Sequence, residues 1–111
     1  MTRDLGLETL LREDLADVQG LTEVTMFGGR CWLSHGKLLC GARTDGLLVR
    51  LGREQAEWAL TKPDVAPMTM GARHMRGWVR AGPAAYGDDG VRAALLAAAL
   101  RFVEALPAEE R

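Results

Sequence analysis

Two glycine-containing turns within residues 26–50 constrain the fold more than any other feature of this sequence. The stretch reads MFGGRCWLSHGKLLCGARTDGLLVR. Asp45-Gly46 is typical of a type I′ hairpin turn, in which both central residues take a positive φ. His35-Gly36 is a weaker signal of the same kind, because histidine tolerates the left-handed region better than most residues do. Two such turns so close together predict a β-meander of three strands.

The register of these strands follows if each turn has two central residues. Cys31 then lies opposite Cys40, and Ala42 lies opposite Val49. The face predicted to point into the core is apolar throughout and carries Cys31, Leu33, Leu38, Cys40, Ala42, Leu47, Val49 and Leu51. The other face is mixed and carries Trp32, Ser34, Lys37, Leu39, Gly41, Arg43, Leu48 and Arg50. A slip of one residue would destroy this separation, so the pattern supports the register.

Apolar periodicity predicts helices and further strands around the meander. Helices are expected over 4–18, 52–60 and 88–106, and strands over 22–27, 65–70 and 74–81, with a loop at 82–87. The first helix has a cap at Thr2 or Asp4. The last helix has a predicted buried stripe of Val91, Leu95, Ala98, Ala99, Phe102 and Leu106. The order is helix, three or four strands, helix, two strands, helix, which predicts an α+β fold with an antiparallel sheet and flanking helices.

Length and charge narrow the classes of protein to consider. The chain has 111 residues, which fits one domain spanning 1–111. No apolar run approaches the roughly 18 residues that a membrane span needs, and the N-terminus lacks a signal-peptide core, so a cytoplasmic protein without a membrane partner is expected. The net charge is −1, from 14 basic and 15 acidic side chains. Most nucleic-acid-binding domains have a basic excess, so specific nucleic-acid binding by this chain alone is not expected.

Four side chains are of types that bind metals or act as nucleophiles: Cys31, His35, Cys40 and His74. They do not form the tight ligand pair typical of a structural zinc site. The predicted register buries both cysteines, whereas a catalytic thiol needs partial exposure and a neighbouring base. We therefore predict no catalytic residue, no metal and no cofactor. An enzyme with a Cys or His centre stays open as an alternative.

Arginines stand beside tryptophans at two places in the sequence. Arg43 and Arg50 share the predicted outer sheet face with Trp32, and three arginines flank Trp78. Arginine beside an aromatic ring is one way in which proteins hold anions. The sequence thus predicts an interaction or ligand face of Trp32, Leu39, Leu48, Arg43, Arg50, Arg73 and Trp78. Its apolar residues favour a protein partner or a homodimer, and its arginines favour a small-molecule or anion site.

A series of short motifs runs in order along nearly the whole chain, from about Leu5 to Leu106. The series is MFGG at 26–29, GKLLCG at 36–41, DGLLVRLG at 45–52, PMTM at 67–70 and MRGWV at 75–79, with Pro83 before the last helix. It resembles the TfoX N-terminal domain family. The resemblance implies a secretion-chaperone-like α+β fold and a role like that of the N-terminal half of regulators of DNA-uptake competence. It implies no catalytic residue. We therefore expect a small cytoplasmic interaction module that is regulatory and non-catalytic.

Overall fold

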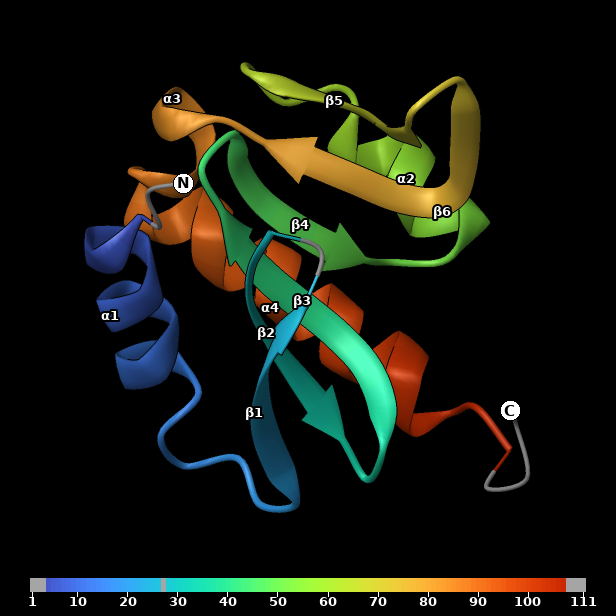
Figure 1. Ribbon diagram of the computed structural model, residues 1–111. Helices are drawn as coiled ribbons and strands as arrows, with labels where there is room; N and C mark the ends of the chain where they lie inside the picture. Colours follow the sequence, from blue (N-terminus) through green and yellow to red (C-terminus); the bar gives the residue numbers. More distant parts are fainter. Residues whose placement is uncertain (1–3, 27, 108–111) are drawn as a thin grey trace.

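The computed structural model describes residues 4–26 and 28–107, which form an antiparallel sheet with helices packed on it (Figure 1). The elements are α1 (Leu5–Asp14), β1 (Leu21–Met26), β2 (Gly29–Ser34), β3 (Lys37–Arg43), β4 (Gly46–Arg50), α2 (Arg53–Ala59), β5 (Val65–Met70), β6 (Arg73–Ala81), α3 (Pro83–Tyr86) and α4 (Asp89–Glu104). This order confirms the predicted α+β fold with an antiparallel sheet. The predicted loop at 82–87 is wrong in part, because residues 83–86 form a short helix that begins with Pro83.

Six strands form one sheet in the order β1-β2-β3-β4-β6-β5. Helix α4 crosses β3 and β4, and α2 lies against β6 (Figure 1). The first helix begins at the predicted cap, where Asp4 Oδ1 accepts a hydrogen bond from the Leu7 amide at 3.0 Å. The other predicted cap, Thr2, and the last residue of the predicted strand 22–27, Phe27, lie outside the described residues. Among the described residues, no helix is long and apolar enough to cross a membrane.

The first predicted turn is confirmed, but the strands beyond it contain a β-bulge. His35 and Gly36 have φ values of 50° and 82°, and Leu33 lies opposite Leu38 as predicted. The register then shifts, and Leu39 is left without a partner on β2. Because of this shift, the residues of β2 that precede Leu33 lie on the opposite side of the sheet from the side that was predicted.

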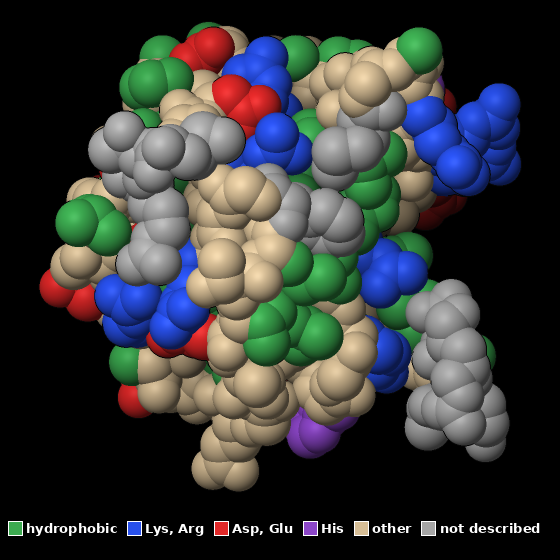
Figure 2. All heavy atoms as spheres, viewed as in Figure 1, with side chains coloured by type: hydrophobic (Ala, Val, Ile, Leu, Met, Phe, Trp, Pro, Cys, Tyr) green, Lys and Arg blue, Asp and Glu red, His purple; other side chains and the backbone are tan. Residues whose placement is uncertain are grey.

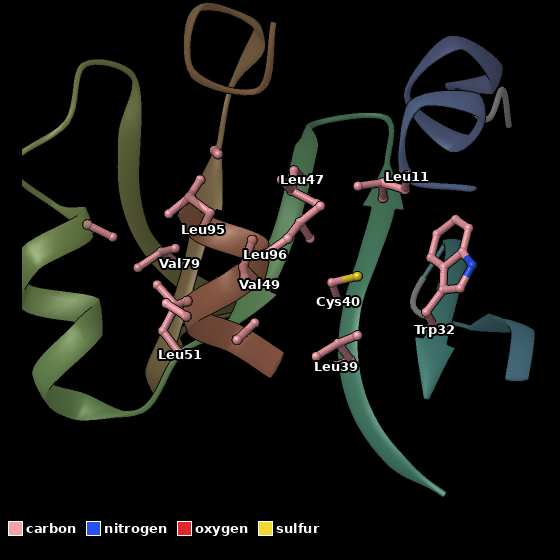
Figure 3. Close-up of a cluster of buried hydrophobic side chains, with 14 of the residues drawn as sticks. Leu11, Trp32, Leu39, Cys40, Leu47, Val49, Leu51, Val79, Leu95 and Leu96 are labelled. Carbon is pink, nitrogen blue, oxygen red and sulfur yellow. The ribbon is translucent and has the colours of Figure 1, made fainter. Parts of the chain in front are cut away.

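This bulge corrects the predicted cysteine pair. Cys31 lies opposite Gly41, and the residue opposite Cys40 is Trp32. Trp32 and Cys40 belong to the main core, whereas Cys31 is buried outside that cluster. The physical reason is size, because an indole ring removes far more apolar surface from water than a thiol does. Figure 3 shows Trp32 below α1, with Leu11 above it.

The second turn has a different centre from the one predicted. Arg43 lies opposite Gly46, so the two central residues are Thr44 and Asp45. A Cβ atom at Gly46 would lie 2.5 Å from the carbonyl oxygen of Ala81. The glycine is therefore needed where β4 approaches β6, rather than inside the turn.

The register of β4 moves by two residues as a result. Ala42 lies opposite Leu47, and Cys40 lies opposite Val49. An even shift preserves the side on which each residue lies. The predicted core residues of β4 are therefore confirmed, although their partners on β3 were wrong.

Helix α4 supplies much of the cover for the sheet. Of its predicted stripe, Leu95, Ala98 and Ala99 are buried as expected. Val91, Phe102 and Leu106 are only partly buried. The side chain of Phe102 reaches the end of β4 instead, where it contacts Gly52.

Candidate anion-binding site

The apolar part of the predicted interaction face is not on the surface. Trp32, Leu39 and Leu48 have exposed fractions of 2%, 0% and 1%. Trp32 and Leu39 belong to the core between the sheet and the helices (Figure 3). Leu48 alternates along β4 with core residues and lies on the other side of the sheet. The prediction of an exposed face around these three residues was wrong, since they are buried within one chain.

The predicted arginines and Trp78 are spread over different parts of the sheet. Arg43 forms an ion pair with Asp45 beside the second turn, with 3.2 Å between Nε and Oδ1. Arg73 is exposed at the beginning of β6. Arg50 and Trp78, in contrast, lie directly opposite each other on β4 and β6. Arg50 and Trp78 border the same hollow.

That hollow lies where the end of β4, the beginning of α2, the middle of β6 and helix α4 meet. It has a volume of about 360 Å³. We call this site the arginine corner and define it by its lining residues, Arg50, Gly52, Arg53, Arg76, Gly77, Trp78 and Phe102. Two further hollows adjoin it, one along α2 and β6 and one between α2 and α4.

Two glycines bring the backbones together at the arginine corner. Gly52 and Gly77 have φ values of 82° and 84°, which favour glycine. The Gly77 carbonyl accepts hydrogen bonds from the amides of Leu51 at 2.8 Å and Gly52 at 3.0 Å. A Cβ atom at Gly77 would lie 3.3 Å from Gly52 Cα, and one at Gly52 would lie 2.6 Å from the Phe102 ring. The base of the site is therefore backbone, with Phe102 packed directly against it.

Arg50 joins the two aromatic rings of the site. Its guanidinium carbon lies 5.8 Å from the Trp78 ring centroid and 5.8 Å from the Phe102 ring centroid. Its Nη1 also donates a hydrogen bond to the Leu38 carbonyl at 3.3 Å. Stacking on both rings and bonding to the backbone restrict the conformations of this long side chain.

The charge of the arginine corner is positive. Three arginines line it, and no carboxylate of the described residues does so. Arg53 and Arg76 form no ion pair with any described residue. Figure 2 shows Lys and Arg side chains gathered on the right-hand side, where Figure 1 places β6 and the end of β4. A concave surface with charge of one sign attracts ions of the opposite sign, so the site suits an anion.

The adjoining hollows are more mixed in charge. The one along α2, of about 440 Å³, includes Glu54, Glu57 and His74 beside the arginines. The one between α2 and α4, of about 370 Å³, includes Glu54 and Arg101. The glutamates reduce the attraction for anions there, which leaves the arginine corner as the most positive of the three hollows.

The thiols are poorly suited to nucleophilic chemistry. Cys31 and Cys40 are both buried, as predicted. Burial raises the pKa of Cys40, and burial raises the pKa of Cys31 in spite of the nearby charge of Arg43. Both groups therefore stay protonated at neutral pH. The described residues contain no group of three or more His, Cys, Asp or Glu side chains that could hold a metal ion.

Comparison with known families identifies the chain. A family model described as the TfoX N-terminal domain matches residues 13–103. The chain belongs to the TfoX N-terminal domain family. The resemblance seen in the motifs is thereby confirmed over most of the sequence. The TfoX N-terminal domain family is not a known enzyme family. No curated protein and no solved structure shows significant similarity to the chain.

The predicted face left out five members of the site in this TfoX-family protein: Gly52, Arg53, Arg76, Gly77 and Phe102. Phe102 was assigned to the core stripe of α4, and Arg53 was part of a predicted helix with no further role. A usable signal was Gly77, because a glycine inside a strand pattern indicates a bulge or a close approach of two backbones. That signal would have marked this part of β6 as a place where another segment packs.

Proposed function

We propose that this protein is a non-catalytic regulatory module that recognises an anionic group at the arginine corner. The observation that carries the proposal is the hollow in which Arg50, Arg53 and Arg76 converge beside Trp78 and Phe102. Membership of the TfoX N-terminal domain family supports a role related to regulators of competence. The protein partner, the homodimer and the cytoplasmic location stay predictions.

The non-catalytic part of the proposal rests on the chemistry of the side chains. The cysteine thiols are buried and have raised pKa values. The arginine corner provides guanidinium groups and aromatic rings, which hold and orient anions but do not transfer protons near neutral pH. The groups at this site are therefore suited to recognition.

Inorganic pyrophosphate is a suitable probe for the anionic group. Isothermal titration calorimetry at low ionic strength would compare the wild-type protein with the double variant Arg53→Gln/Arg76→Gln. Charged hydrogen bonds contribute about 1.5–3 kcal/mol each, so we expect the double variant to bind pyrophosphate at least about tenfold more weakly.

Arg73→Gln is the matched control, because Arg73 is exposed on the same strand as Arg76 but outside the hollow. It should bind pyrophosphate like the wild type. Equal weakening by the control and the double variant would contradict recognition at the arginine corner. Phosphorus NMR after long incubation should recover pyrophosphate unchanged, and its hydrolysis by the protein would contradict a non-catalytic role.

A further inference from the structure

We infer that the ligand of the arginine corner is a small molecule that joins a phosphate group to a flat ring, of the nucleoside monophosphate class. This inference rests on the proposed function, because it names the ligand for the same site. It follows from the two kinds of side chain that the hollow brings together, guanidinium groups and aromatic rings.

The guanidinium groups indicate a phosphate rather than a single carboxylate. Arg50, Arg53 and Arg76 come from the end of β4, the beginning of α2 and the middle of β6. Each guanidinium presents a fork of N–H donors that matches two oxygens of one anion. A terminal phosphate has three acceptor oxygens and a charge of about −1.5 to −2 near neutral pH. It can therefore satisfy several arginines at once, as a carboxylate with two oxygens cannot.

The aromatic rings indicate a flat group next to the phosphate. Trp78 and Phe102 are both only partly buried, so part of each ring borders the hollow. Arg50 lies 5.8 Å from the centroid of each ring and holds positive charge at the same place. Nucleobases stack on aromatic side chains and on arginine planes, in a way that tolerates different bases. The site offers both kinds of surface within one hollow.

The shape of the hollow favours a small ligand. The backbone at Gly52 and Gly77 forms its base, and the Phe102 ring packs where a Cβ atom of residue 52 would lie. Its volume of about 360 Å³ lies within the range of roughly 300–1,000 Å³ usual for small-molecule pockets. Since the chain has a net charge of −1, it lacks the basic excess usual for proteins that follow a polynucleotide backbone.

The inference can be tested by titrating the wild-type protein with matched probes. These are adenosine monophosphate, ribose phosphate, adenosine, inorganic pyrophosphate and indole carboxylate. We expect adenosine monophosphate to bind about tenfold or more tightly than ribose phosphate, because the base adds stacking. Indole carboxylate should bind more weakly, because it lacks the phosphate. NMR of the wild-type protein should also show a shift of the Trp78 indole N–H signal as the nucleotide binds.

Two substitutions at Trp78 separate the ring from the phosphate. Trp78→Leu removes the aromatic surface and should reduce adenosine monophosphate affinity to about that of ribose phosphate, with pyrophosphate binding unchanged. Trp78→Phe retains a ring and should retain most of the affinity for the nucleotide. Trp58→Leu is the control, because Trp58 stacks with Lys62 outside the arginine corner, with Lys62 Nζ 5.4 Å from its ring centroid. Circular dichroism would establish that each variant is folded.

The outcomes separate this inference from the proposed function. If adenosine monophosphate binds no more tightly than ribose phosphate or pyrophosphate, the ring is not recognised, and the inference fails while anion recognition stands. If indole carboxylate binds most tightly, the phosphate assignment fails. If no anionic probe binds the wild-type protein, both proposals fail. A wild-type NMR shift at Trp78 with the expected order of affinities supports the inference even where a variant does not fold.

Discussion

Arg92 of α4 and Asp14 at the end of α1 form the shortest ion pair among the described residues, with Arg92 Nε donating to Asp14 Oδ2 over 2.6 Å. Arg92 is only 5% exposed. Its Nη1 also donates to the Tyr86 carbonyl at 2.8 Å, and the Tyr86 hydroxyl donates to Asp4 Oδ2 at 3.0 Å. Helix α1 is therefore joined to α3 at its N-terminal end and to α4 at its C-terminal end. It covers the core around Trp32.

Replacing Arg92 should destabilise the fold without affecting the arginine corner. Arg92→Ala removes a nearly buried charge from three partners, Asp14, Asp89 and the Tyr86 carbonyl. The expected loss is about 2–4 kcal/mol in the free energy of unfolding, because Asp14 is partly exposed and can be rehydrated. Urea denaturation followed by circular dichroism would measure it. Arg101→Ala, an exposed change on the same helix, should stay within about 0.5 kcal/mol of wild type. Equal effects would contradict the role of the Arg92 network.

Substitution of Trp32 should act on folding rather than on assembly. Its side chain is 2% exposed, and the Arg12 guanidinium carbon lies 6.0 Å from its ring centroid. Trp32→Ala should therefore lower the free energy of unfolding by about 3–5 kcal/mol. Urea denaturation gives this value, and light scattering of the remaining folded protein gives its mass. If Trp32→Ala had the stability of the wild type but half its mass, Trp32 would belong to a dimer interface, and the prediction would be contradicted.

The fold was predictable where the signal is local. The turn at His35-Gly36 and the apolar spacing of α4 depend on residues close in sequence, and each predicted the observed element. The bulge at Leu39 was not predictable in the same way. Burial of the Trp32 indole under α1 depends on a helix that comes more than ten residues earlier. Such a tertiary contact can override an ideal hairpin register.

For a related reason, the sequence predicted only part of the arginine corner. Arg50 and Trp78 were both selected for the predicted ligand face, but together with Arg73, which does not line the hollow. They meet because β6 inserts beside β4 in the sheet. Phe102 joins them from α4, and neither strand register nor helix periodicity predicts that approach. The residues that complete the site come from four segments, so their proximity is a property of the topology.

The two cysteines should be unreactive and should not form a disulfide with each other. Both are 0% exposed, and burial raises the pKa of each thiol. Because only the thiolate attacks, labelling by a disulfide reagent should be slow in the native protein and fast in urea. Cys31 lies opposite Gly41 and outside the core cluster that holds Cys40, so mild oxidation should leave two free thiols by mass spectrometry. A disulfide formed without denaturant would contradict this register.

The free energy of unfolding should fall in acid, in part because Glu23 becomes protonated. Hydrogen bonds from Arg12 and then Arg30 lower the pKa of this carboxyl group, against the effect of its partial burial. A carboxyl group with a lowered folded-state pKa stabilises the protein above its unfolded-state value, about 4.3. That contribution is lost as the pH falls through the folded-state pKa. Urea midpoints measured across this range should therefore decline more steeply for the wild type than for Glu23→Gln. Glu13→Gln, on the exposed side of α1, should decline as the wild type does, and an identical slope for Glu23→Gln would contradict the prediction.

Gly52 and Gly36 can be compared to test the packing at the arginine corner. Both have a φ of 82°, and Gly52 also has a ψ of 164°, a combination that is essentially restricted to glycine, so alanine at Gly52 adds backbone strain of about 1–3 kcal/mol before any side-chain contact. A Cβ atom at Gly36 meets nothing within 4 Å, whereas one at Gly52 would lie 2.6 Å from the Phe102 ring. Gly52→Ala should therefore lower the free energy of unfolding by about 1–3 kcal/mol more than Gly36→Ala. Adding Phe102→Leu to each variant should recover part of this difference at Gly52 and none at Gly36, because the smaller side chain relieves a clash at one site alone. Urea denaturation of the four variants measures the coupling between the two positions. Equal losses at the two glycines, with no coupling to Phe102, would show that Phe102 does not pack against the backbone that forms the base of the site.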